Sequence, residues 1–186
     1  MSGRMIVHDA RLAGTAPPIA PNIYVVNATV DIQHCIGWIG HYARSQSCLD
    51  ELLIMCHGFE ANWDLGRRMS TMQQVGGFGL QLCREGLSLY NVGLVRSWNG
   101  LIRRITVYAC APADTGSGNE GTAGDGRRFM GEMAIWSGAE VIAARDTQTY
   151  TYGPASPIDF GNWEGPVYRF DPRTGNPSAF TPGKMR

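Results

Sequence analysis

The sequence predicts an α/β protein built on a mainly parallel sheet that is flanked by helices on both faces. Short apolar runs rich in β-branched residues recur along the chain, and amphipathic segments with helical spacing separate them. This alternation is typical of parallel strands joined by right-handed helical crossovers. The length of 186 residues and the 44% share of hydrophobic residues suit one domain with a sizeable core.

The individual elements follow from local patterns. Isoleucine, tyrosine and valine gather at 23–28, which predicts the first strand. Asp31 is expected to cap the next helix, whose apolar face includes Ile32 and Ile36. Further strands are expected at 52–58, 101–109 and 139–144, helices at 78–95 and 127–137, and a short amphipathic turn or hairpin at 69–75.

Proline and glycine divide the chain into three regions. Residues 1–22 contain Pro17, Pro18 and Pro21 and are expected to form an extended N-terminal arm. Residues 23–149 form the α/β domain. Residues 150–186 hold six of the ten prolines and are expected to form an extension packed on the same domain, with a small hairpin around the turn at 171–175.

Charge and cysteine content argue against several classes of protein. Sixteen basic and sixteen acidic residues cancel, so no net field favours nucleic acid or an anionic membrane as a partner. The chain shows no signal-type N-terminus and no apolar run of about 18 residues, so a cytoplasmic protein is expected, with export by a route lacking such a signal as the alternative. The five cysteines form no C-x-x-C pair and no zinc-like spacing with histidine, so neither a disulfide framework nor a metal or cofactor is expected.

Two apolar runs end in reactive side chains. The run at 52–56 leads into His57 and Gly58, and the run at 105–109 leads into Cys110. A thiol is a good nucleophile only as thiolate, and a neighbouring imidazole commonly holds it in that form. Because ligands bind at the carboxyl ends of parallel strands, two neighbouring strands would present this pair at one edge. Taken singly, each side chain has an alternative interpretation as an ordinary core or surface residue.

This arrangement resembles the caspase-like cysteine peptidases, most closely the bacterial members related to gingipains, separase and CHAT domains. The resemblance covers residues 23–146, and the spacing of His57 and Cys110 is close to the roughly 50 residues of the caspase pair. It implies an α/β/α sandwich in which Cys110 is the nucleophile and His57 assists proton transfer. It also implies an oxyanion hole formed by the backbone N–H groups of Gly58 and Cys110.

The residues around the cysteine depart from the caspase motif. Tyr108 stands where caspases have glutamine, and Pro112 stands where they have glycine, so aspartate specificity is not implied. The expected function is hydrolysis of peptide bonds in a peptide or protein substrate by acyl-enzyme chemistry. The alternative is a caspase-like binding or signalling module without activity, because a fold does not guarantee its chemistry.

Two carboxylates are candidates for reading the substrate side chain. Asp31 follows the first expected strand, and Asp146 follows the last core strand. A carboxylate in the substrate pocket would favour cleavage after arginine or lysine. Each residue also has a plain structural interpretation, Asp31 as a helix N-cap and Asp146 as a turn residue at a strand end.

Overall fold

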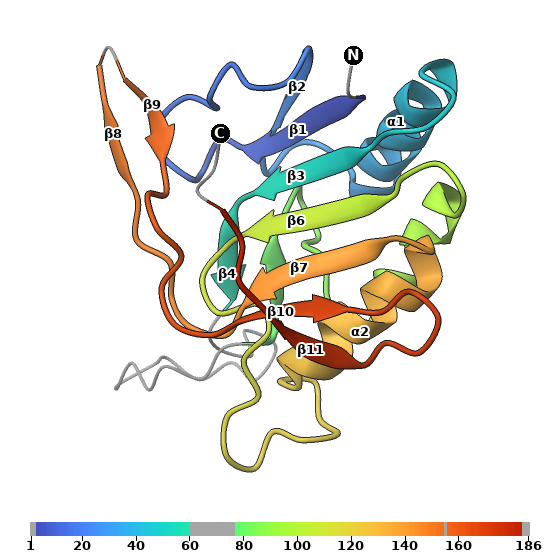
Figure 1. The fold of residues 1–186 in the computed structure, drawn as a ribbon. Coiled ribbons are helices and arrows are strands. Elements are labelled where there is room, and N and C mark those ends of the chain that lie inside the picture. Colours follow the sequence, from blue (N-terminus) through green and yellow to red (C-terminus); the bar gives the residue numbers. More distant parts are fainter. Residues whose placement is uncertain (1–2, 60–76, 155, 184–186) are drawn as a thin grey trace.

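The computed structural model describes residues 3–59, 77–154 and 156–183, and its centre is one seven-stranded sheet (Figure 1). From one edge to the other, the strands are β2 (Asn22–Val26), β1 (Arg4–Asp9), β3 (Glu51–Met55), β6 (Arg104–Tyr108), β7 (Glu140–Ala144), β10 (Val167–Phe170) and β11 (Pro177–Phe180). The first five of these are parallel, and β10 and β11 pair antiparallel. The predicted mainly parallel α/β sheet is therefore confirmed.

The helices of the described residues pack on a single face of the sheet. Helix α1 (Ile32–Ser45), the 3-10 helix η2 (Val92–Trp98) and helix α2 (Gly126–Ser137) share one core cluster with Leu52 and Ile54 of β3 (Figure 1). The alternate residue Leu53 faces the other side, where it packs with Tyr108, Phe160 and residues of the 10–21 segment. The expectation of helices on both faces is not confirmed in this part of the chain.

The expected N-terminal arm over residues 1–22 is wrong for its first half. Arg4–Asp9 is strand β1, which lies between β3 and β2 and is buried from Met5 to Asp9. The prolines that suggested an arm lie in the connection between β1 and β2. The apolar run of β1 is short and ends in His8 and Asp9, so its composition does not look like that of a central strand.

The helix expected at 78–95 is also wrong. The segment forms strand β5 (Gly79–Gln81) and, further on, the start of η2. Leu80 exchanges backbone hydrogen bonds with Leu87 at 2.7 and 2.9 Å, and left-handed backbone at Cys83 (φ 59°) and Gly86 (φ 72°) turns the chain. These tertiary pairings override a leucine spacing that looks helical. The turn or hairpin expected at 69–75 lies outside the described residues.

The strand expected at 52–58 is divided into β3 and β4 (His57–Phe59), and β4 pairs with β5 in a separate two-stranded sheet. Other predicted elements are present. The Asp31 carboxylate accepts from the N–H groups of Gln33 and His34 and caps α1. Helix α2 ends at Gly138, whose left-handed conformation (φ 64°) closes it. The C-terminal hairpin is β10–β11, and it extends the main sheet next to β7. The extension therefore contributes two strands to the main sheet. In the described ranges, no helix is both long enough and apolar enough to span a bilayer.

Variants of Trp98 test how much the packing between η2 and α1 contributes to stability. This side chain is fully buried, and its Nε1 donates to the Ile36 carbonyl of α1 at 2.9 Å. We expect Trp98→Ala to lower the free energy of unfolding by about 3–5 kcal/mol, because it leaves a large cavity. Trp98→Phe keeps most of the volume and should cost only about 1–2 kcal/mol. Urea denaturation followed by far-UV circular dichroism measures both, and a cost below about 1 kcal/mol for the alanine variant would contradict this packing role.

Candidate active site at the ends of strands β3 and β6

The ends of β3 and β6 meet at one edge of the sheet. The two strands are parallel neighbours with Met55 opposite Tyr108, and the Cys56 N–H donates to the Tyr108 carbonyl at 3.2 Å. The pairing thus continues to the residues that lead into His57 and Cys110. After Cys56 the chain leaves the sheet as strand β4 (His57–Phe59), which runs down the edge where the β3, β6 and β7 arrows end (Figure 1).

Gly58 and Cys110 approach each other closely through their main chains. A Cβ atom built on Gly58 would lie 1.9 Å from the Cys110 carbonyl oxygen and 3.1 Å from the Cys110 nitrogen. No side chain fits in that space, so glycine is required by the contact itself. The structure therefore brings Gly58, the residue after His57, against the main chain of Cys110. The pairing of the His57 ring with the Cys110 thiol stays a prediction.

The Gly58 N–H points away from the strand that pairs with β4. Gly58 lies opposite Leu80 of β5 in an antiparallel ladder. Leu80 uses its own N–H and carbonyl on Leu87. Because antiparallel pairs alternate between bonded and non-bonded types, Gly58 and Leu80 form a non-bonded pair. The Gly58 amide is therefore directed to the side opposite β5.

The ring of His57 is held by a backbone carbonyl. Its Nε2 lies 3.1 Å from the Arg11 carbonyl oxygen. A carbonyl oxygen only accepts hydrogen bonds, so this contact places the proton of a neutral ring on Nε2 and leaves the lone pair on Nδ1. A histidine in this tautomer can take a proton through Nδ1. Arg11 carries no sequence signal for this role, because a backbone carbonyl is common to all residues and Arg11 lies in the segment expected to be an arm.

Cys110 sits in a tight turn that is anchored to the end of β7. Its thiol lies 3.8 Å from the Gln148 carbonyl oxygen, and its side chain is half-buried. The next residue, Ala111, has left-handed backbone (φ 47°), which is unusual for a residue with a Cβ. The Ala111 N–H donates to the Asp146 carbonyl at 3.2 Å, and the Ala113 N–H donates to the Ala144 carbonyl at 3.0 Å. These bonds hold the turn in a sparsely populated conformation, as is common at functional sites.

The other cysteines are in different environments. A hydrogen bond with the Cys83 thiol and then burial raise the pKa of Cys35, and burial, followed by the Asp9 charge, raises the pKa of Cys56. Thiols with raised pKa values are poor nucleophiles. Cys48 is half-buried like Cys110 but lies beyond the end of α1, next to Leu49. Cys110 follows β6 directly, and its main chain lies against Gly58.

The two candidate substrate-reading carboxylates do not come together. Asp31 is the N-cap of α1, and its other oxygen forms an ion pair with Arg84 at 2.7 Å. Asp146 pairs with Arg145 at 2.6 Å, and its carbonyl accepts from Ala111 next to Cys110. They follow β2 and β7, with β1, β3 and β6 between them. Of the two, Asp146 is the one bonded to the cysteine turn.

The glycine-rich loop after Cys110 is organised around Asp125. This buried carboxylate accepts from the Thr115 hydroxyl (2.8 Å), the Gly121 N–H (2.8 Å) and the Arg128 N–H (3.1 Å). Burial raises the pKa of Asp125, but these three donors outweigh that effect, and the pKa lies below its ordinary value. The loop therefore has a defined anchor, although its composition suggests flexibility.

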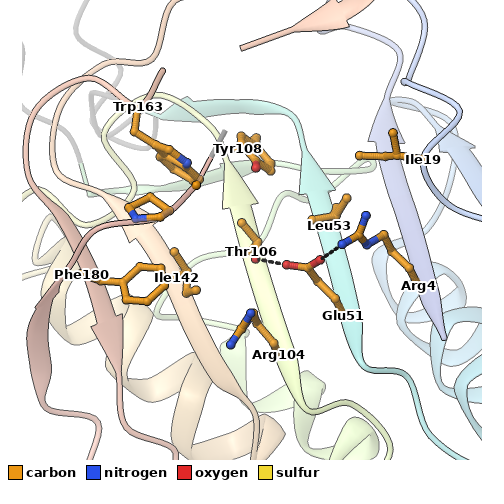
Figure 2. A pocket seen from close by; sticks show the side chains of 12 residues that line it. Arg4, Ile19, Glu51, Leu53, Arg104, Thr106, Tyr108, Ile142, Trp163 and Phe180 are labelled. Atoms are coloured by element: carbon orange, nitrogen blue, oxygen red, sulfur yellow. Dashed lines mark hydrogen bonds and ion pairs between the residues drawn. The ribbon is translucent and has the colours of Figure 1, made fainter. Parts of the chain in front are cut away.

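A separate cavity of about 200 Å³ lies on the sheet face opposite the helices (Figure 2). Figure 2 shows Trp163, Tyr108 and Phe180 around it, with the chain of contacts from Thr106 to Glu51 to Arg4 on its floor. Its two guanidinium groups already pair with carboxylates, Arg4 with Glu51 and Arg104 with Glu140. The lining does not include His57, Gly58 or Cys110. Across the described residues, no cluster of three or more histidine, cysteine or acidic side chains is placed to hold a metal ion.

Comparison with known proteins gives no relative for this chain. No family model, no curated protein and no solved structure matches it.

The contact between Gly58 and Cys110 predicts that a methyl group added at position 58 destabilises the protein. Gly58→Ala should displace the Cys110 turn and lower the free energy of unfolding by about 2 kcal/mol or more, because the added Cβ overlaps a backbone carbonyl. Gly37→Ala is the matched control: it lies on α1 with open space around its Cβ position and should stabilise by about 0.5–1 kcal/mol. Urea denaturation compares the two, and equal effects would contradict the close approach.

The lowered pKa of Asp125 predicts a pH-dependent contribution to stability. An acid with a depressed folded-state pKa stabilises fully above its ordinary value of 3.8 and loses this effect as pH falls through the folded-state pKa. We expect Asp125→Asn to cost about 1–3 kcal/mol at pH 7, with the difference from wild type shrinking below about pH 4. Urea denaturation at pH 7, 5 and 3 measures this, and a difference that does not change with pH would be contrary evidence.

Proposed function

We propose that this protein is a cysteine endopeptidase of caspase-like fold with His57 and Cys110 as its catalytic pair. The observation that carries the proposal is the meeting of the His57–Gly58 main chain with Cys110 at the carboxyl edge of the sheet. The parallel order of β3 and β6 and the imidazole tautomer set by Arg11 support it.

The chemistry begins as the thiol proton of Cys110 passes to His57 Nδ1, which charges the imidazole and leaves a Cys110 thiolate. Its sulfur attacks the peptide carbonyl carbon, and the carbonyl oxygen becomes an oxyanion that the Gly58 and Cys110 N–H groups stabilise. The orientation of the Gly58 amide away from β5 supports this role. The C–N bond then breaks, the leaving amine takes a proton from His57, and a thioester remains on Cys110. Water hydrolyses the thioester, which releases the carboxylic acid and restores the thiol.

We further propose that cleavage follows a basic residue and that Asp146 reads it. Asp146 is bonded through its carbonyl to the turn that carries Cys110, whereas Asp31 is used in capping α1. A substrate guanidinium or ammonium would exchange with Arg145 for the half-exposed Asp146 carboxylate.

The alternative is a caspase-like module that binds partners without cutting them. One observation favours it: the Asp146 carboxylate is already paired with Arg145, so the proposed basic subsite is occupied. In that case the His57–Cys110 edge would serve as a structural turn or a binding surface.

Peptide cleavage by point variants separates the two functions. We expect the purified protein to cleave fluorogenic peptides, with highest kcat/KM for arginine or lysine before the cut bond. Cys110→Ala should abolish turnover, and His57→Ala should lower kcat about 10²–10⁴-fold, because it removes the general acid and base. Cys48→Ala, which changes the other half-buried thiol, should cleave like wild type.

Thiol labelling measures directly whether His57 activates the Cys110 thiol. Limiting iodoacetamide should alkylate Cys110 before Cys48, and His57→Ala should slow the reaction at Cys110 but not at Cys48. Cleavage that persists in Cys110→Ala, or a folded wild type that cuts no member of a diverse peptide library, would contradict the peptidase and leave the binding module.

A further inference from the structure

We infer that the buried Asp9 is a positioning residue for His57, because its carboxylate fixes the Arg11 carbonyl that accepts a hydrogen bond from His57 Nε2–H. The inference rests on the proposed function for its catalytic consequence. The geometry behind it is independent of that function.

Asp9 is fully buried at the carboxyl end of β1, and both of its oxygens are occupied. Oδ1 accepts from the Arg11 N–H (3.1 Å) and from Arg11 Nε (2.8 Å). Oδ2 accepts from Arg11 Nη2 (2.7 Å) and from the Cys83 N–H (2.9 Å). The carboxylate therefore binds both the main chain and the side chain of the residue whose carbonyl meets His57.

The turn that contains Arg11 is fixed by further hydrogen bonds besides those of the Asp9 carboxylate. The Leu12 N–H donates to the Asp9 carbonyl at 2.9 Å, which closes the turn after β1. His8 Nε2 lies 2.9 Å from the Leu12 carbonyl oxygen, so two histidine rings contact consecutive carbonyls of one turn. With its side chain bound to Asp9, Arg11 has little freedom to rotate its carbonyl away from His57.

Cys83 connects this turn to the main chain of His57. Its N–H binds Asp9, and its carbonyl accepts from Arg11 Nη2 at 2.6 Å. The Cys83 backbone is left-handed (φ 59°). Two residues before it, Gln81 of β5 pairs with His57 of β4. The His57 main chain and the His57 ring are thus tied to the same Asp9–Arg11–Cys83 unit.

The location of this unit argues for a role in addition to stability. A buried ion pair is poor evidence for stabilisation, because desolvation offsets much of the attraction and apolar replacements are often as stable. Here the pair lies directly behind the acceptor that determines which ring nitrogen of His57 carries the proton. Without it, the Arg11 carbonyl is free to move, and His57 would populate the tautomer whose Nδ1 carries the proton and cannot accept one.

Asp9→Asn tests the inference, because it keeps the size of the side chain and removes the charge that binds the Arg11 guanidinium. We expect kcat for peptide cleavage to fall about tenfold with KM within about twofold, since misplacing a catalytic group affects the chemical step. Nitrogen-15 NMR should show the neutral His57 ring changing from one tautomer, with the proton on Nε2, to a mixture; the His57→Gln spectrum assigns the signals. Arg11→Lys keeps the ion pair but loses its bidentate geometry. Its kcat and its share of the Nε2–H tautomer should lie between those of wild type and Asp9→Asn.

The matched control is Asp50→Asn, which removes the Asp50–Arg103 ion pair next to the start of β3. It should change neither kcat nor the His57 tautomer. The inference is overturned if folded Asp9→Asn keeps wild-type kcat and the Nε2–H tautomer, even when its stability drops. If Asp9→Asn does not fold, Arg11→Lys decides by the same two readouts. A wild type without peptidase activity contradicts the proposed function, whereas the NMR result still decides whether Asp9 positions His57.

Discussion

The candidate site depends on the parallel pairing of β3 with β6. This pairing aligns the ends of two strands that are far apart in the sequence, so that the residues after them lie side by side. The space left between the two main chains admits only glycine at position 58. A change that shifts the register of either strand would separate Gly58 from Cys110, whatever happens to the side chains themselves.

The edge of the sheet is held by polar contacts and the body of the sheet by apolar ones. One face of the sheet packs against the helices, while the other is covered by the 10–21 and 150–166 segments. At the carboxyl edge, the Asp9, Arg11 and Cys83 contacts hold one side of the site and the β7 carbonyls hold the Cys110 turn. The Asp9–Arg11 contacts follow β1, which is next to β3, and the carbonyls that hold the Cys110 turn belong to or follow β7, which is next to β6. The sheet therefore supports the groups that we propose to be catalytic.

Sequence patterns predict a large part of this fold, and the failures have clear causes. The apolar runs of β3, β6 and β7 and the capped helices α1 and α2 carry strong local signals. Strand β1 was missed because its short apolar run ends in His8 and Asp9, which are buried only because they bond to other parts of the chain. Leu80 and Leu87 looked helical in spacing, yet they pair with each other as extended backbone.

The sequence by itself determined strands β3, β6 and β7 and the cap residues of α1 and α2, because these depend on local composition and spacing. It also indicated the two residues that we propose as nucleophile and base. Only the tertiary structure decided which strands are neighbours, that Gly58 touches Cys110, and that Arg11 holds the His57 ring. Those contacts join residues distant in the sequence and use backbone groups, which every residue type possesses. A backbone carbonyl that orients a histidine therefore leaves no mark in the sequence, although the buried aspartate behind it can be found once the fold is known.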